Sequence, residues 1–164
     1  VLRLQAGGEL GAVPGVTGAV GVAGGLLWRR LRVELQGVFL APRTVSREGV
    51  ALRVSLLAGS LHGCWRGGRG ALEAPLCGGV ELGGLRGAAA RAATGLWVTL
   101  QVGQGLVWHV SPRVSVSATL QLVVAPRRPS FELQNARASR ELFAPSPVSG
   151  RVIVGVELRL GDPW

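Results

Sequence analysis

Residues Leu96–Val124 read LWVTLQVGQGLVWHV, then SPR, then VSVSATLQLVV. Apolar and polar residues alternate with a period of two in both arms. Because successive side chains on a strand point to opposite faces, each arm is predicted to be a strand with one apolar and one polar face. The segment Ser111–Arg113 then forms the turn of an antiparallel hairpin. Each arm has about ten residues or more, the length that a tilted strand needs to cross a bilayer, whereas soluble strands usually have about five or six.

The same alternation recurs along the whole chain and predicts eight strands. Their ranges are Val1–Val13, Val16–Trp28, Leu31–Ala41, Val50–Trp65, Leu72–Leu85, Leu96–Val110, Val114–Val124 and Gly150–Leu160. The expected loops include Pro42–Gly49, Arg86–Thr94 and the longest connection, 125–149. We therefore expect one all-β domain, residues 1–164, folded as a closed antiparallel up-and-down transmembrane β-barrel of eight strands.

One strand departs from strict alternation. In Val50–Trp65 the apolar positions change parity at Leu56-Leu57. A single extra residue would produce such a slip, so the pattern predicts a β-bulge there. With this bulge, Leu52 and Val54 face outward and Arg53 faces inward.

The composition excludes several other classes of protein. Charged residues make up 16% of the chain, against about 25% in soluble domains. No apolar run of spanning-helix length lacks heavy glycine interruption, and no glycine set matches a dinucleotide or P-loop motif. The 18 basic residues are all arginines, which indicates a high-GC genome, and no basic stripe with interleaved aromatics points to nucleic acid. Because the chain begins with Val1 and has no methionine, we expect that a signal peptide or upstream region was removed.

The polar face is predicted to line the lumen. It is rich in small and amide side chains, and its charges nearly balance, which suits a closed interior of paired ions. We expect a lumen ion network of Arg3, Glu9, Arg32, Glu34, Arg53, Glu73, Glu81, Glu157 and Arg159, with Arg86 and Arg151 on the same face. The apolar face is almost free of charge, as lipid contact requires, because arginine at the bilayer midplane costs roughly 2–4 kcal/mol. A soluble lipocalin-like barrel with an apolar cavity would show the same period and stays an alternative.

In this pattern the chain resembles the small eight-stranded outer-membrane barrels of the OmpA and OmpX type. The final strand also looks like the assembly signal of outer-membrane proteins, with Gly155 followed by Leu158 and Leu160 near the C-terminus. It lacks an aromatic last strand residue, although Trp164 follows shortly. The resemblance implies export through the periplasm to the outer membrane of a Gram-negative bacterium.

Cys64 and Cys77 flank the expected turn Arg66–Gly70 on neighbouring strands. The periplasm is oxidising, so we expect a disulfide between them. Two free thiols are the alternative. The two cysteines with His62 do not complete a zinc site, and we expect no metal and no cofactor.

His109 is the leading catalytic candidate. A turn centred on Pro112 pairs it with Ser115 on the polar face, and Glu157 on the next strand could orient the imidazole. Serine, base and carboxylate are the components of a nucleophilic site. The favoured interpretation is nevertheless that these three residues belong to the hydrogen-bonded lumen.

The turns and loops carry most of the remaining arginines. Those of the longest connection, Arg127, Arg128, Arg137 and Arg140, could bind lipopolysaccharide phosphates through bidentate contacts, or could simply be solvated. The sequence thus favours a non-enzymatic outer-membrane barrel with a plugged lumen and a structural, anchoring or surface-interaction role. A lipid-modifying enzyme and a soluble lipocalin-like binder are the alternatives.

Overall fold

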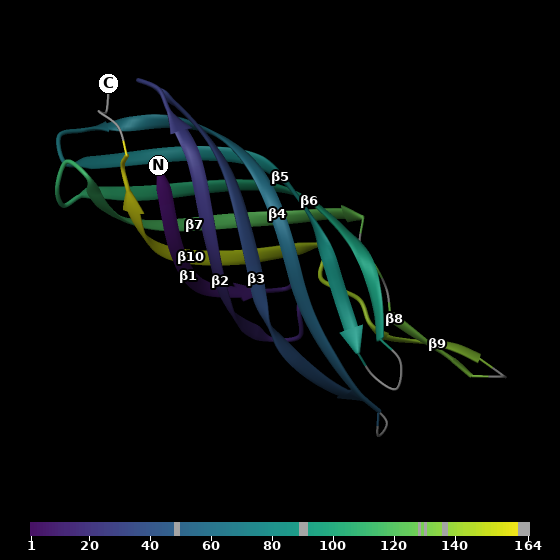
Figure 1. Ribbon diagram of the computed structural model, residues 1–164. Helices are drawn as coiled ribbons and strands as arrows, with labels where there is room; N and C mark the ends of the chain where they lie inside the picture. The colour runs from purple at the N-terminus through teal and green to yellow at the C-terminus, as the bar shows by residue number, and fades with distance from the viewer. Residues whose placement is uncertain (48–49, 89–91, 128, 130, 136–137, 161–164) are drawn as a thin grey trace.

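The computed structural model confirms an all-β chain in which eight strands form a closed antiparallel barrel (Figure 1). It describes residues 1–47, 50–88, 92–127, 129, 131–135 and 138–160. The barrel strands are β1 (Leu2–Leu10), β2 (Val16–Leu27), β3 (Leu31–Arg47), β4 (Val50–Arg69), β5 (Leu72–Ala88), β6 (Ala92–His109), β7 (Val114–Arg127) and β10 (Val148–Leu158). Within the predicted loop 125–149, β8 (Phe131–Asn135) and β9 (Ala138–Phe143) form a separate two-stranded sheet.

Closure depends on the pairing of the first and last strands. β1 and β10 pair in one unbroken register from Leu2↔Leu158 to Leu10↔Gly150, and the other neighbours follow chain order. Every barrel strand therefore has a partner on both sides. This closure is what allows a sheet to exist in hydrocarbon, where unpaired backbone groups have no water to bind.

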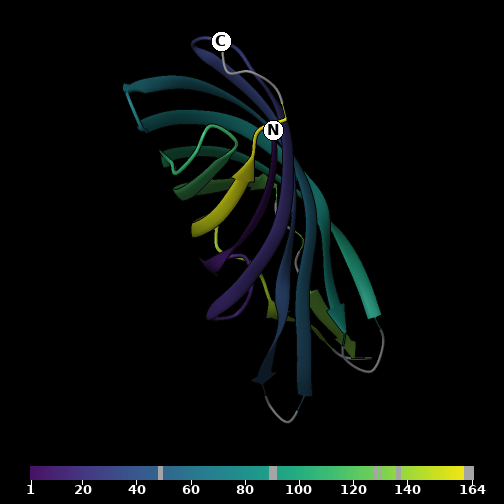
Figure 2. The same ribbon diagram turned by 60° about the vertical axis from the view of Figure 1, so that its left-hand side comes forward.

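The barrel has two unlike ends. At the turn end, Trp28–Arg30, Gly70–Ala71 and Val110–Arg113 connect the strands, and this is the end where β1 begins and β10 finishes (Figure 1). At the opposite loop end, β3, β4, β5 and β6 project beyond the shorter strands (Figure 2). The expected loops Pro42–Gly49 and Arg86–Thr94 are therefore largely wrong. Their backbones continue the antiparallel ladder, as the pairs Thr44↔Arg53 and Arg86↔Thr94 show.

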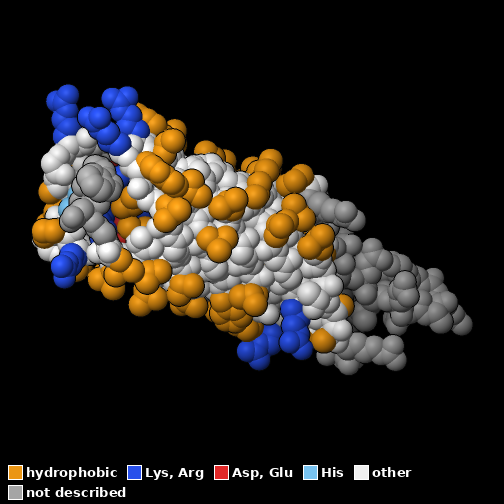
Figure 3. All heavy atoms as spheres, turned by 45° about the horizontal axis from the view of Figure 1, so that its top comes forward, with side chains coloured by type: hydrophobic (Ala, Val, Ile, Leu, Met, Phe, Trp, Pro, Cys, Tyr) orange, Lys and Arg blue, Asp and Glu red, His pale blue; other side chains and the backbone are white. Residues whose placement is uncertain are grey.

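The aliphatic face points outward, as the alternation predicts. Leu4 is 70% exposed, Leu35 67% and Leu120 62%, and hydrophobic side chains are spread over the visible wall of the barrel (Figure 3). The inward positions of the same strands carry buried charged and amide side chains, including Arg3, Glu34 and Gln121. This arrangement is the reverse of a lipocalin-like barrel, so that alternative is wrong.

The predicted β-bulge at Leu56-Leu57 is wrong as well. β4 keeps one parity from Leu52 to Cys64, with its even-numbered residues buried. The register shift lies in β3 instead, between Leu40 and Arg43.

The reason for the error is an apolar plug inside the loop end of the barrel. Its buried side chains include Val38, Leu40, Leu52, Val54, Leu56, Leu85, Trp97 and Val123. Because the lumen is apolar at this level, apolar residues there occupy inward positions, and Arg53 and Arg86 on the alternate positions are exposed. Ala12, in the expected first strand Val1–Val13, is also buried in the plug.

Among the described residues, no helix has the length and apolar character needed to span a membrane.

Candidate functional site

Charged residues fill the middle of the lumen and link strands across it. Arg151 on β10 donates to Glu9 on β1 at 3.0 and 3.2 Å, and to Glu81 on β5 at 2.9 Å. Glu81 also accepts hydrogen bonds from Trp97 Nε1 at 2.9 Å and from Gln101 Nε2 at 2.7 Å. Arg151, Glu9 and Glu81 are almost completely buried. The guanidinium therefore holds together strands on both sides of the barrel.

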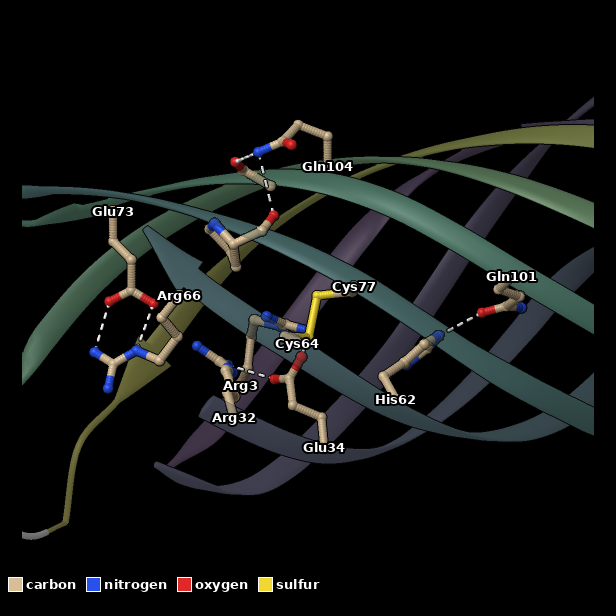
Figure 4. Close-up of a disulfide and its surroundings, with 12 residues drawn as sticks. Arg3, Arg32, Glu34, His62, Cys64, Arg66, Glu73, Cys77, Gln101 and Gln104 are labelled. Atoms are coloured by element: carbon tan, nitrogen blue, oxygen red, sulfur yellow. Dashed lines mark hydrogen bonds and ion pairs between the residues drawn. A yellow bond between two sulfur atoms is a disulfide. The ribbon is translucent and has the colours of Figure 1, made fainter. Parts of the chain in front are cut away.

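A second group of ion pairs lies nearer the turn end. Arg3 donates to Glu34 at 3.2 Å, and Arg32 contacts both Glu34 and Glu157. Arg159 extends the chain of contacts, because its Nε lies 3.2 Å from Glu157. Figure 4 shows Arg3, Arg32 and Glu34 beside the disulfide.

The last pair lies at the rim. Arg66 makes two hydrogen bonds to Glu73, at 2.8 and 2.7 Å (Figure 4), and Arg159 lies 3.5 Å from the same carboxylate. A bidentate pair of this kind is the strongest form of charge-assisted hydrogen bond.

The structure brings together eight of the nine residues expected in the network. Arg53 is the exception, since it lies on the exposed face of β4. Arg151 and Arg66 complete the network, so that the described ion pairs join five arginines (Arg3, Arg32, Arg66, Arg151, Arg159) to five glutamates (Glu9, Glu34, Glu73, Glu81, Glu157). Matched charge is what makes such a buried set tolerable, because an unpaired buried ion is strongly destabilising.

One described cavity in the lumen is small. A cavity between Arg32, Glu34, His62 and Gln121 has a volume of about 20 Å³. Small residues help the long side chains to fit. A Cβ at Gly155 would lie 2.7 Å from the Leu4 carbonyl oxygen and 3.1 Å from Arg3 Cγ. The glycine therefore provides the space that the Arg3 side chain occupies.

The disulfide between Cys64 and Cys77 is confirmed. The two residues are directly opposite each other on β4 and β5, and their Cα atoms are 4.0 Å apart. The nearby His62 forms a hydrogen bond of 2.6 Å with Gln101 (Figure 4). Among the described residues, no group of three or more His, Cys, Asp or Glu side chains could hold a metal ion.

Of the three catalytic candidates, His109 and Ser115 are in contact and Glu157 contacts other residues. His109 pairs with Ser115 across β6 and β7, and Nδ1 lies 2.9 Å from Ser115 Oγ. Glu157 does not orient the imidazole, since it contacts Arg32 and Arg159 instead. The carboxylate nearest to His109 Nε2 is that of Glu73, at 3.5 Å. The sequence pointed to Glu157, which lies on β10 next to β7. Glu73 lies on β5, on the other side of β6, and was therefore missed.

Ser115 is fully buried. A nucleophile must be reached by a substrate carbon, and the cavity at the turn end is lined by His109 but not by Ser115. The hydrogen bond thus supports a structural role for the pair.

The arginines considered for lipopolysaccharide contact are only partly placed. Arg127 ends β7 and Arg140 lies on β9, and nothing is described of their side chains. Arg128 and Arg137 lie outside the described residues. At the loop-end parts of β3, β4 and β5 the structure exposes Arg43 and also Arg53 and Arg86, which were expected in the lumen.

No protein-family model matches the chain, and no curated protein matches it. Solved structures do match over nearly the whole length. Neisserial surface protein A is 12% identical, with 97% of each chain covered and a TM-score of 0.64. A major outer membrane protein from Thermus thermophilus is 13% identical, with 96% of this chain and 97% of that chain covered and a TM-score of 0.67. Ail, the attachment invasion locus protein of Yersinia pestis, is 9% identical, with 96% and 94% covered and a TM-score of 0.57.

Identities this low show a shared fold alone. The chain is a closed eight-stranded antiparallel barrel that matches the barrels of outer-membrane proteins.

Proposed function

We propose that this chain is a non-enzymatic barrel of the outer membrane of a Gram-negative bacterium, with a plugged lumen and a structural, anchoring or surface-interaction role. The observation that carries the proposal is that an aliphatic outer wall surrounds a lumen filled by side chains at two levels. Paired arginines and glutamates fill the middle, and the apolar plug fills the loop end. Side chains just fill an eight-stranded barrel, so the fold by itself favours a closed interior.

The loop end is the surface that we assign to interaction. In outer-membrane barrels short turns face the periplasm and longer connections face outside. On that orientation the extensions of β3–β6 and the β8–β9 hairpin project from the cell. Ail, which shares the fold, has been solved in complex with the heparin analogue sucrose octasulfate. For this chain, the exposed Arg43, Arg53 and Arg86 suit the phosphates of lipopolysaccharide, because guanidinium groups bind phosphate in bidentate fashion.

Planar-bilayer recording tests the closed lumen. We expect no stable conductance from the purified protein, because the lumen is blocked at two levels. A large and persistent conductance would overturn the proposed role.

The assigned surface is tested by lipopolysaccharide binding to nanodisc-embedded protein. Arg43→Gln, Arg53→Gln and Arg86→Gln together should weaken binding. Arg113→Gln, an exposed arginine at the turn end, is the matched control and should bind as the parent protein does. Equal loss in both variants would contradict the assignment of the loop end.

A further inference from the structure

The turn end of the barrel contains a basic mouth, which is a cavity of about 310 Å³. Its charged lining consists of Arg29, Arg66, Arg69, Arg159, His109 and Glu73. The β2–β3 turn contributes Arg29 and the β4–β5 hairpin contributes Arg66 and Arg69. A hydrogen bond of 2.6 Å from Arg66 to the Trp28 carbonyl oxygen holds these two connections together. The volume is at the lower end of the range of small-molecule sites.

The charge of this mouth is not balanced by its own lining. Glu73 is the only carboxylate among the described lining residues, and Arg66 engages both of its oxygens. Arg159 is already paired with Glu157. Arg29 and Arg69 are exposed and line the opening. Basic side chains also gather at this end in Figure 3. The mouth therefore favours an anionic group.

An apolar groove on the outer wall meets the mouth at Arg29. The groove is lined by Trp28, Arg29, Arg30, Leu31 and Val33 and has a volume of about 690 Å³. Arg29 is thus shared by an apolar site outside the barrel and a basic site at its end. A ligand that fits both must carry a negative group joined to a hydrocarbon chain.

Tryptophans place this junction at the level of a membrane interface. Trp28, Trp65 and Trp108 are 49%, 56% and 55% exposed on the outer wall. Leu31, which lines the groove, pairs with Trp65, and Leu72 pairs with Trp108, so the three rings lie near the same end of the wall. Tryptophan is enriched where the hydrocarbon ends and the headgroups begin.

We propose that one anionic phospholipid binds at this junction. Arg29 and Arg69 hold its phosphate at the basic mouth, and one acyl chain lies in the groove against Trp28, Leu31 and Val33. The proposal rests on the membrane location of the proposed function, but not on a closed lumen or on the loop-end surface. On the orientation given above, the lipid belongs to the periplasmic leaflet.

Native mass spectrometry of the protein in a non-ionic detergent tests the proposal with palmitoyl-oleoyl phosphatidylglycerol as the probe. We expect one molecule to bind more tightly than the zwitterionic phosphatidylcholine analogue. Arg29→Gln with Arg69→Gln should weaken binding about 25-fold, because each arginine at an anionic lipid surface contributes about fivefold. Arg113→Gln, which lines neither cavity, should change binding less than about twofold.

A second pair of variants tests the groove. Trp28→Ala should weaken binding about fivefold, as expected for the loss of roughly 40 Å² of apolar contact. Trp108→Ala is the matched control and should leave binding unchanged. Any of three results would overturn the proposal. The two lipids could bind with equal affinity, a variant and its control could lose equal affinity, or glycerol phosphate could bind as tightly as the whole lipid. Failure of the protein to enter nanodiscs would overturn the membrane location, and this proposal with it.

Discussion

Arg151→Met should be the most damaging single change in the lumen. The Arg151 guanidinium is fully buried and bonds to Glu9 and Glu81, which are 142 and 70 residues away along the chain. Methionine is unbranched, shorter than arginine and has no donor. The change therefore leaves two buried carboxylates without their shared cation.

The expected loss of stability depends on the hydrogen bonds that each carboxylate retains. Removing one partner of a buried ion pair costs about 3–5 kcal/mol, so we expect a loss of at least this size in the free energy of unfolding. After the change Glu81 still accepts hydrogen bonds from Trp97 and Gln101. Glu9 loses both of the bonds that Arg151 donates to it. Adding Glu9→Gln should consequently restore more stability than adding Glu81→Gln, and the triple variant should be more stable than Arg151→Met alone, since it leaves no unpaired buried charge.

Equilibrium unfolding in urea, with the protein folded into lipid vesicles and followed by tryptophan fluorescence, measures these differences. Arg53→Met is the control, because alternation assigns Arg53 to the lumen whereas the structure exposes it. A surface change of this kind should shift stability by less than about 0.5 kcal/mol. The reasoning would be refuted if Arg151→Met cost less than about 1 kcal/mol, or if the triple variant were as unstable as the single one.

Three further outcomes are expected. Leu35 lies on the exposed wall, four residues along β3 from Leu31, which pairs with Trp65. Leu35→Arg should reduce folding stability in vesicles by about 2–4 kcal/mol, whereas Leu31→Arg near the interface should cost about 0–1 kcal/mol. Equal costs would contradict the assignment of the wall to lipid. Replacement of both Cys64 and Cys77 by alanine should lower the free energy of unfolding by about 3 kcal/mol, measured against the oxidised parent, and no change on reduction of the parent would contradict a stabilising disulfide. A serine-reactive fluorophosphonate should not label the folded protein, because Ser115 is buried; robust labelling that disappears in Ser115→Ala would instead support the lipid-modifying enzyme.

The amino-acid sequence by itself determined the eight barrel strands, though not their full lengths, and the outward face outside the apolar plug; it also predicted the disulfide. Alternation with a period of two is a local property, so it specifies which face of a strand each residue occupies without knowledge of its partner. Short turns specify the hairpin registers in the same way. The pair His109↔Ser115 follows from a turn centred on Pro112. The expected turn Arg66–Gly70 is wrong, because β4 continues to Arg69 and the turn is Gly70–Ala71. It is this turn that places Cys64 opposite Cys77.

Only the tertiary structure decided which inward residues meet. The contact of Arg151 with Glu9 and Glu81 exists because β10 closes against β1 and the chain then curves around a narrow lumen. The apolar plug likewise reverses the expected positions of Leu52 and Arg53. Alternation says that two successive residues face opposite sides, but whether the inside is polar or apolar at a given height depends on side chains that arrive from every strand of the barrel at once.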